Sequence, residues 1–359
     1  MSSRFLFSIS AVLLAGTAAT AATITPVVPI QSDGCYQIST AEELYGFAEI
    51  VNGNDSIPGN SAVCGELLKD IVVNKNVLKE SGRLNSNSAK TFVPWIPLVG
   101  FSGTFNGNGH VISGLYSATK SGLFETIVSE DSVVVIRDLG LVDSYFSPAS
   151  TAGVLANNIS GRAKVQITNF YTLSTIETRT RDPYMGVITA NFGSYTHLTV
   201  TNCYNAGLLV DNKDRFYSGF FGSGVSGYRN INVSNSYTLK QKGVSYVPYG
   251  TLVDSAAFSN GAVAYALREG EDGSIWGQNV GTDKYPGFSG SLVNSAAARY
   301  NVTFHTFEGD TVSYFDSYIS GFNVVLPKNV EQENMYFDGW YRDSEFSGTP
   351  DTVISDTTK

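Results

Sequence analysis

The sequence predicts an all-β protein whose central part is a right-handed parallel β-helix, a solenoid of short strands stacked coil on coil. The first observation is a fixed interval, because Asn169, Asn202 and Asn235 are 33 residues apart (202 − 169 and 235 − 202). The second is that apolar and polar residues alternate before each asparagine, which indicates a half-buried strand. A repeat of this kind cannot bury its apolar face alone but can do so against its own copies. Two further sets of residues keep the same interval: Tyr171, Tyr204 and Tyr237, and Gly153, Gly186 and Gly219.

Each repeat supplies at least two short strands. Coils stacked about 4.8 Å apart bring like residues together, so we expect asparagine amides to hydrogen-bond and tyrosine rings to stack between coils. We expect about six coils over residues 65–255. A β-propeller is the alternative, but its blades need about 40 residues and four strands each. The strands are expected around 165–167, 198–200 and 231–233 before the asparagines, and around 122–124, 153–155, 186–188 and 219–221 from the glycines onward.

The first residues have the features of an export signal. Arg4 precedes an apolar run over residues 5–15, and small residues follow up to Ala21. This order is typical of a secretory signal peptide at residues 1–21, with cleavage after Ala21. The alternative is a membrane anchor, but the run is much shorter than the roughly 20 residues that a spanning helix needs. No later segment could span a bilayer, so we expect no membrane span after signal removal.

An N-terminal cap is expected at residues 22–64, because an open solenoid end exposes unpaired backbone groups. Thr40 and Glu43 form a T-x-x-E capping box, and the apolar residues within 41–51 fall on one helical face. A helix at 41–51 would therefore cover the first coil.

The chain has three cysteines. Cys35 and Cys64 bracket the N-terminal cap, and we expect them to form a disulfide in an oxidising compartment. Cys203 would then be unpaired, either as a buried inert thiol, which we favour, or as a reactive one. The sequence holds no CxxC or HExxH spacing, so a zinc site has no support. We expect no cofactor.

The run of residues 101–115, with the later segments "SGLF" and "AGVL", resembles bacterial surface proteins that carry GLUG-type repeats. The resemblance covers residues 36–290 and is most specific at 101–124. It implies an exported surface protein built on a right-handed β-helix, and it implies no defined reaction.

A C-terminal cap or plug is expected at residues 256–298. Residues 262–268 have a helical pattern, and Trp276 follows in a glycine-rich loop. The stretch resembles the "GxVAYxL…WGQxxGTDxYP" segment that ends many surface solenoids, and we expect Trp276 to be buried.

Residues 299–359 resemble a Listeria-Bacteroides (internalin B-type) repeat, with the "FxGWY" core at 337–341. The resemblance implies a small β-grasp-like module. The family pattern closes with a further strand that this sequence lacks, so either the sequence is a fragment of a longer protein or the module is incomplete.

The charge of the chain bears on its partners. The net charge is −9, whereas nucleic acids and anionic membranes require basic patches. We therefore expect no nucleic-acid partner. The remaining partners are a carbohydrate or another surface protein.

No catalytic residue can be assigned, and the candidate binding residues lie in a charged corner between the tyrosine and glycine ladders. They are Asp182, Tyr184, Asp211, Asp214 and Tyr217. Carboxylates and exposed aromatic rings of this kind could bind a carbohydrate or calcium. The structural interpretation is that Arg181 pairs with Asp214, and Asp182 with Arg215, across neighbouring coils, and that the tyrosines stack. His110 and His197 are isolated in the sequence and are expected at the surface or in corners.

Three functions follow for a secreted or cell-surface protein. The first is an adhesion or binding module for a carbohydrate or a host or substrate surface. The alternatives are a polysaccharide-active β-helix enzyme, a lyase or hydrolase, and a passive structural stalk. Hydrolysis would need two convergent carboxylates, and lyase chemistry a calcium site and a basic residue.

Overall fold

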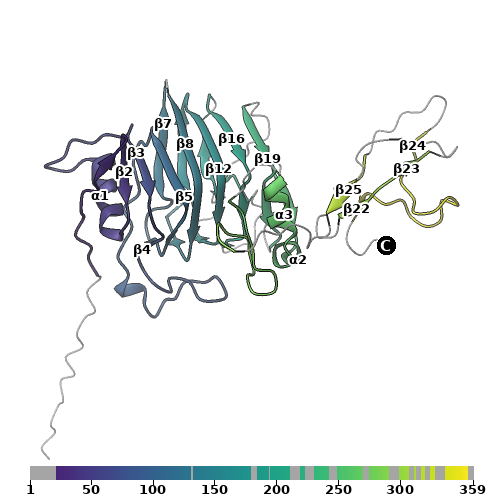
Figure 1. The fold of residues 1–359 in the computed structure, drawn as a ribbon, viewed down its shortest axis with the longest axis horizontal. Helices are drawn as coiled ribbons and strands as arrows, with labels where there is room; N and C mark the ends of the chain where they lie inside the picture. The colour runs from purple at the N-terminus through teal and green to yellow at the C-terminus, as the bar shows by residue number, and fades with distance from the viewer. Residues whose placement is uncertain are drawn as a thin grey trace, which may run out of the picture.

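The protein is a parallel β-helix of about six turns with short helices at its two ends (Figure 1). The computed structural model describes residues 22–130, 132–178, 184–193, 195–210, 219–222, 230–241, 249–269, 275–290, 299–306, 311–312, 317–319, 324–327 and 336–354. Among these residues only α1, α2 and α3 are α-helical, and one 3-10 turn lies at Ala89–Thr91. The expected β-helix with short helices is confirmed.

The largest sheet runs the length of the solenoid and has 12 strands. Its main path has the order β1-β2-β3-β5-β8-β12-β17-β20-β21, with β4, β16 and β19 attached. All its pairings are parallel except β1 with β2. The strands are β1 (Gln31–Ser32), β2 (Cys35–Ile38), β3 (Cys64–Leu67), β4 (Ile71–Val72), β5 (Thr104–Ser113), β8 (Val133–Val142), β12 (Lys164–Thr172), β16 (His197–Thr201), β17 (Tyr204–Asn205), β19 (Ile231–Ser234), β20 (Tyr237–Leu239) and β21 (Thr251–Val253).

Three smaller parallel sheets form the other sides of the coils. The first is β6 (Tyr116–Ser117), β9 (Tyr145–Phe146), β13 (Thr175–Glu177) and β18 (Leu209–Val210). The second is β7 (Phe124–Ser129), β11 (Ala156–Gly161) and β15 (Thr189–Phe192), and the third is β10 (Ala152–Gly153) with β14 (Met185–Gly186). Gly153 pairs with Gly186 in the third sheet, as the 33-residue interval predicts.

The coils bend within the largest sheet at a stack of residues with left-handed backbone. Asp138, Asn169, Asn202 and Asn235 have φ values of 54°, 52°, 54° and 42°. Asparagine and aspartate tolerate this conformation better than other residues with a side chain, which explains why asparagine recurs at the corner. The side chains also form a ladder, because Asn169 donates to Asp138 at 2.8 Å and Asn235 to Asn202 at 2.7 Å.

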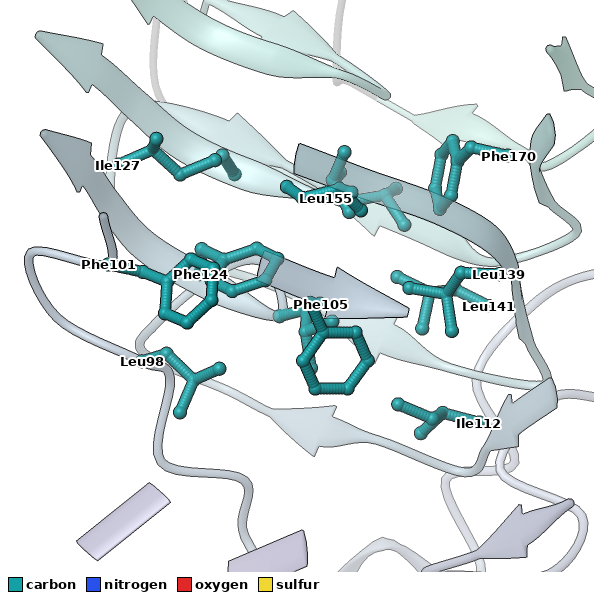
Figure 2. Packing of buried hydrophobic residues seen from close by; sticks show 14 of the residues in the cluster. Leu98, Phe101, Phe105, Ile112, Phe124, Ile127, Leu139, Leu141, Leu155 and Phe170 are labelled. Atoms are coloured by element: carbon teal, nitrogen blue, oxygen red, sulfur yellow. The ribbon is translucent and has the colours of Figure 1, made fainter. Parts of the chain in front are cut away.

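The interior of the solenoid is apolar. Side chains from facing sheets meet in the space between the ribbons, and Phe105, Phe124 and Leu139 lie among them (Figure 2). All three have no exposed surface. Burial of such side chains contributes about 1.5–3 kcal/mol each and is the main force that holds successive coils together.

Helix α1 (Ala41–Asn52) covers the first coil at the N-terminal end (Figure 1). The capping box is present: the Thr40 hydroxyl accepts from the backbone of Glu43, and the Glu43 carboxylate accepts from the backbone of Thr40. Phe47 points into the coil and packs edge-on against Phe105, with ring centroids 5.8 Å apart. A Cβ atom at position 65 would lie 2.6 Å from the Phe47 ring. The packing of Phe47 into the coil therefore requires a residue without a side chain at this position, Gly65.

Cys35 and Cys64, the two cysteines expected to pair, are joined by a disulfide. They lie opposite each other in the parallel pair β2 and β3, so the bridge fastens β2 to β3. Cys203 is free and buried.

Two helices, α2 (Ser255–Ser259) and α3 (Ala262–Glu269), close the C-terminal end (Figure 1). Asn235 donates to the carbonyl oxygen of Ala266 in α3 at 3.0 Å. Trp276 is fully buried, as expected. The Tyr171 and Tyr204 rings stack at 5.1 Å with planes 17° apart, and the Trp276 ring lies 5.7 Å from each.

Residues 74–93 leave the solenoid as a long loop that returns against the sheet of β6, β9 and β13. Asp143 accepts hydrogen bonds from the backbone of Val77 and Leu78, at 3.1 and 2.7 Å. The Thr175 hydroxyl donates to the carbonyl of Gly82 at 2.6 Å. These contacts hold the loop over one side of the coils.

The described residues of the C-terminal region form three short antiparallel pairs. They are β22 (Arg299–Asn301) with β25 (Ser317–Ile319), β23 (Phe304–His305) with β24 (Thr311–Val312), and β26 (Val324–Val325) with β27 (Val353–Ile354). Trp340 of the "FxGWY" core packs on Phe304 at 4.7 Å and donates to the carbonyl of Pro327 at 2.8 Å.

Candidate functional site

The outer face of the largest sheet carries rows of polar side chains. In residues 164–168 of β12 and throughout β16 every second residue points inward, and Ile167 and Val200 are fully buried there. The residues between them face outward. Parallel pairing at a regular interval then places equivalent outward residues of successive coils next to one another.

Two of these rows run from coil to coil with hydrogen-bonding side chains. One row is Gln166, Thr199 and Asn232, and the other is Thr168, Thr201 and Ser234. Within the part of the chain that the structure describes, the side chains of Gln166, Thr199 and Asn232 have no hydrogen-bond partner. In the second row, the Thr201 and Ser234 hydroxyls lie 3.2 Å apart. The first row therefore offers free donors and acceptors about 4.8 Å apart.

A basic and aromatic corner adjoins the first strands of this face. We define it as Arg162, Lys164, Tyr195 and His197, all of them exposed. Lys164 pairs with His197 across β12 and β16. The Arg162 guanidinium lies 5.9 Å from the centre of the Tyr195 ring, a cation–π contact. Tyr195 is 70% exposed, so most of its side chain is accessible to solvent.

The turn geometry explains how the corner forms. Gly161 has a φ of 75°, which favours glycine, and the chain turns sharply before β12. In the next coil Thr196 donates its backbone amide to the carbonyl of Gly193 at 3.1 Å. The backbone amide of His197 then donates to Ala163 at 2.8 Å. These bonds set Tyr195 beside Arg162.

The charges of the corner differ from those of the strand beside it. Neither Arg162 nor Lys164 forms an ion pair with any residue in the described ranges. Arg137, on the neighbouring strand β8, is instead paired with Asp138 at 3.0 Å. Glu130 lies in the turn of the preceding coil and makes no ion pair with Arg162 either.

Of the five residues expected to form a binding site, the structure describes only Tyr184. Asp182, Asp211, Asp214 and Tyr217 lie outside the described residues, as do the proposed partners Arg181 and Arg215. Tyr184 is 48% exposed and directly precedes β14, where its carbonyl accepts from Ala152 at 2.9 Å. It belongs to a different side of the coil from Tyr195, which lies between β15 and β16.

His110 is not isolated, contrary to the expectation from the sequence. Its Nδ1 lies 3.2 Å from a carboxylate oxygen of Asp70, and the same oxygen accepts from the backbone of Val111 at 3.0 Å. Asp70 thus ties the segment after β3 to β5, and it also contributes, after burial, to a raised pKa of Tyr171. The partner was missed because Asp70 lies 40 residues away, outside the 33-residue interval.

His197 is exposed, as expected, but it is not isolated, since it has Lys164 as its cross-strand neighbour and Tyr195 two residues before it. The signal was present in the sequence. Arg162 and Tyr195, like Lys164 and His197, are 33 residues apart (195 − 162 and 197 − 164). A search for identical residues at that interval does not find these two pairs. A search for charged or aromatic residues of any type at that interval would find them.

The described residues contain no group of three or more histidine, cysteine, aspartate or glutamate side chains that could hold a metal ion. Burial raises the pKa of the Cys203 thiol to about 12, which disfavours its thiolate form and nucleophilic reactivity. Within the same residues, no helix is both long enough and apolar enough to cross a membrane.

Comparisons with known proteins identify no relative by sequence. No family model matches the chain, and no curated protein matches it. Among solved structures, the chain is similar to "a putative immunoglobulin A1 protease from Bacteroides ovatus", at 12% identity and a TM-score of 0.38, over 71% of this chain and 92% of that one. A likeness this low carries no argument about function.

Proposed function

We propose that this protein is an exported binding module that holds a linear carbohydrate on the outer face of its largest sheet. The observation that carries the proposal is the row of Gln166, Thr199 and Asn232, whose side chains are free to form hydrogen bonds. Amide and hydroxyl groups both donate and accept, which matches the hydroxyl groups of a sugar.

The repetition of the row favours a polymer over a single sugar. Each of the three coils in the row adds one hydrogen-bonding group along the solenoid axis, at a spacing of about 4.8 Å, whereas the equivalent residue of β8 is Val135. That spacing is close to the length of one sugar residue in an extended chain. Successive sugars would therefore meet equivalent groups on successive coils.

Tyr195 adds the second element of carbohydrate recognition, an exposed aromatic ring in the turn before β16, four residues before Thr199 of the polar row. The apolar face of a pyranose ring packs well on an aromatic ring whose other contacts hold it in place. Arg162 supplies such a contact from the neighbouring coil.

The cellular location and the repeat family remain part of this proposal. Export rests on the signal-like residues 1–21, and a secreted or cell-surface location follows from them. The resemblance of residues 101–124 to GLUG-type repeats and of 337–341 to a Listeria-Bacteroides repeat supports a surface protein. The lyase or hydrolase alternative rests on the acidic residues within 179–183 and 211–218, which lie outside the described part.

A glycan array probed with the full chain tests the proposal. We expect binding to a linear glycan, and we expect the triple variant Gln166→Ala, Thr199→Ala, Asn232→Ala to lose it. A matched control changes exposed polar residues of two loops, Ser86→Ala, Asn87→Ala and Ser150→Ala, and should bind like the wild type. Absence of binding to every glycan would favour the passive stalk and overturn the proposal.

A further inference from the structure

We propose that the carbohydrate is acidic, with carboxylate or sulfate groups that are bound by Arg162 and Lys164. This inference rests on the proposed function, because it specifies which class of glycan the same face binds. It starts from the charge of that face.

On four successive coils the strands of this face carry one carboxylate, that of Asp138, on a chain that is acidic as a whole. The chain has 32 aspartate and glutamate residues against 23 lysine and arginine residues. The other outward residues of β8, β12, β16 and β19 include no acid: Val133, Val135, Arg137, Lys164, Gln166, Thr168, His197, Thr199, Thr201, Asn232 and Ser234. A strip of this composition attracts anions on a protein that otherwise repels them.

The cations on this strip are not equivalent. Arg137 is neutralised by Asp138 at 3.0 Å, whereas Lys164 is exposed and has no acidic partner among the described residues. Arg162 has only the ring of Tyr195 as its partner, so its guanidinium donors remain available. Two cations with unused donors are the groups that charge-assisted hydrogen bonds to a carboxylate or sulfate require.

The positions of these groups suit one sugar residue of a chain. The Tyr195 ring is largely exposed and has Arg162 over it, and Lys164 belongs to the same coil as Arg162. A pyranose packed on Tyr195 would place an acidic substituent toward the two cations. The chain would then continue along the row that contains Gln166, Thr199 and Asn232.

The small number of unpaired cations on this face disfavours a nucleic acid as the ligand. A phosphate backbone carries one charge per nucleotide and is normally bound by many cations. Here two unpaired cations lie beside neutral hydroxyl and amide rows, and Glu130 stands in the preceding turn. This arrangement fits a polymer with intermittent acid groups and many hydroxyls.

A matched pair of polymers tests the inference: β-1,4-linked polymannuronate and its methyl ester, which share a backbone and differ in charge. We measure binding of the full chain to each by calorimetry at low salt. The acid should bind about tenfold more tightly than the ester, because charge-assisted bonds are roughly twice as strong as neutral ones. Added salt should remove this preference.

A charge-reversal variant and a matched control locate the effect. Arg162→Glu with Lys164→Glu should abolish the preference for the acid. Arg83→Glu with Lys90→Glu makes the same change of net charge on two exposed residues of the 74–93 loop and should retain it. Circular dichroism checks that both variants fold.

The other possible outcomes overturn either the acidic class of the glycan or carbohydrate binding as a whole. Equal binding of acid and ester, with loss of both in the triple polar-row variant, overturns the acidic class and leaves carbohydrate binding in place. No binding to either polymer or to any glycan on the array overturns both proposals. Single-stranded DNA that competes as well as polymannuronate overturns recognition of a glycan in favour of general attraction of polyanions.

Discussion

The side-chain amide of Asn235 donates a hydrogen bond of 2.7 Å to the carboxamide oxygen of Asn202 in the preceding coil, and both residues have left-handed backbone. The asparagine thus has two roles at this corner. It adopts a conformation that most residues avoid, and its side chain links one coil to the next. At the end of the ladder, Asn235 also holds helix α3 through Ala266.

Replacement of Asn202 should separate these two roles. Asn202→Ala loses the acceptor and places alanine at positive φ. We therefore expect the free energy of unfolding to fall by about 2–3 kcal/mol. Asn202→Gly loses only the acceptor and adopts the conformation freely, so the loss should be about 1 kcal/mol. Urea unfolding measures both. Equal losses in the two variants would show that backbone conformation is not the reason for asparagine here.

Removal of the disulfide should destabilise the N-terminal end. Cys35 and Cys64 are separated by 29 residues, and a cross-link over a loop of this length stabilises by about 3–4 kcal/mol. The double variant Cys35→Ser, Cys64→Ser should lose this amount in urea unfolding. The control is the wild type in reductant, which should unfold like the variant. A difference between them under reducing conditions would mean that the serines themselves perturb the cap.

Trp276, in the C-terminal plug, should contribute as much to the free energy of unfolding as a large residue of the solenoid core. Trp276 is fully buried, lies 4.7 Å from Phe288 and donates to the side-chain oxygen of Asn169 at 3.1 Å. Trp276→Ala should cost about 3–5 kcal/mol. Trp276→Phe keeps most of the packing and loses the hydrogen bond, at about 1 kcal/mol. Limited proteolysis should cut residues 275–290 faster in the alanine variant only, and equal cutting in the wild type would contradict a plug.

The architecture of the coils was predictable because the sequence repeats its pattern of polarity as well as individual residues. Alternation of apolar and polar residues defined which side of β12 and β16 faces inward, and the constant interval defined their register, in which Leu198 pairs with Val165 and Ile231. The left-handed corner could have been predicted too, since asparagine is the commonest residue with a side chain in that conformation.

Other parts depend on contacts that no periodicity predicts. The 74–93 loop is held by single interactions, such as those of Asp143 with the backbone of Val77 and Leu78. The pair of His110 and Asp70 forms in the same way. The basic and aromatic corner combines different residue types at equivalent positions, so identity between repeats does not reveal it.

Alkaline conditions should destabilise the fold through its buried tyrosines and its free cysteine. Burial raises the pKa of Cys203 from its ordinary value of 9.0 to about 12, and burial also raises the pKa values of Tyr45, Tyr171 and Tyr204 above 10.0. A pKa that is higher in the folded state contributes stability that is fully present below the unfolded value and is lost as pH rises. The contribution of these four groups to the free energy of unfolding should therefore be constant up to about pH 8 and fall from about pH 9 upward.

Tyr204 offers the sharpest test of this dependence. Its hydroxyl donates to the carbonyl of Pro286 in the plug, so ionisation would remove a donor and bury a charge at once. Tyr204→Phe should be less stable than the wild type at neutral pH, by about 1 kcal/mol. Its stability should fall less steeply above pH 10, because one group with a raised pKa is gone. Urea unfolding at a series of pH values measures both slopes, and parallel alkaline slopes in the two proteins would exclude Tyr204 as a source of the loss.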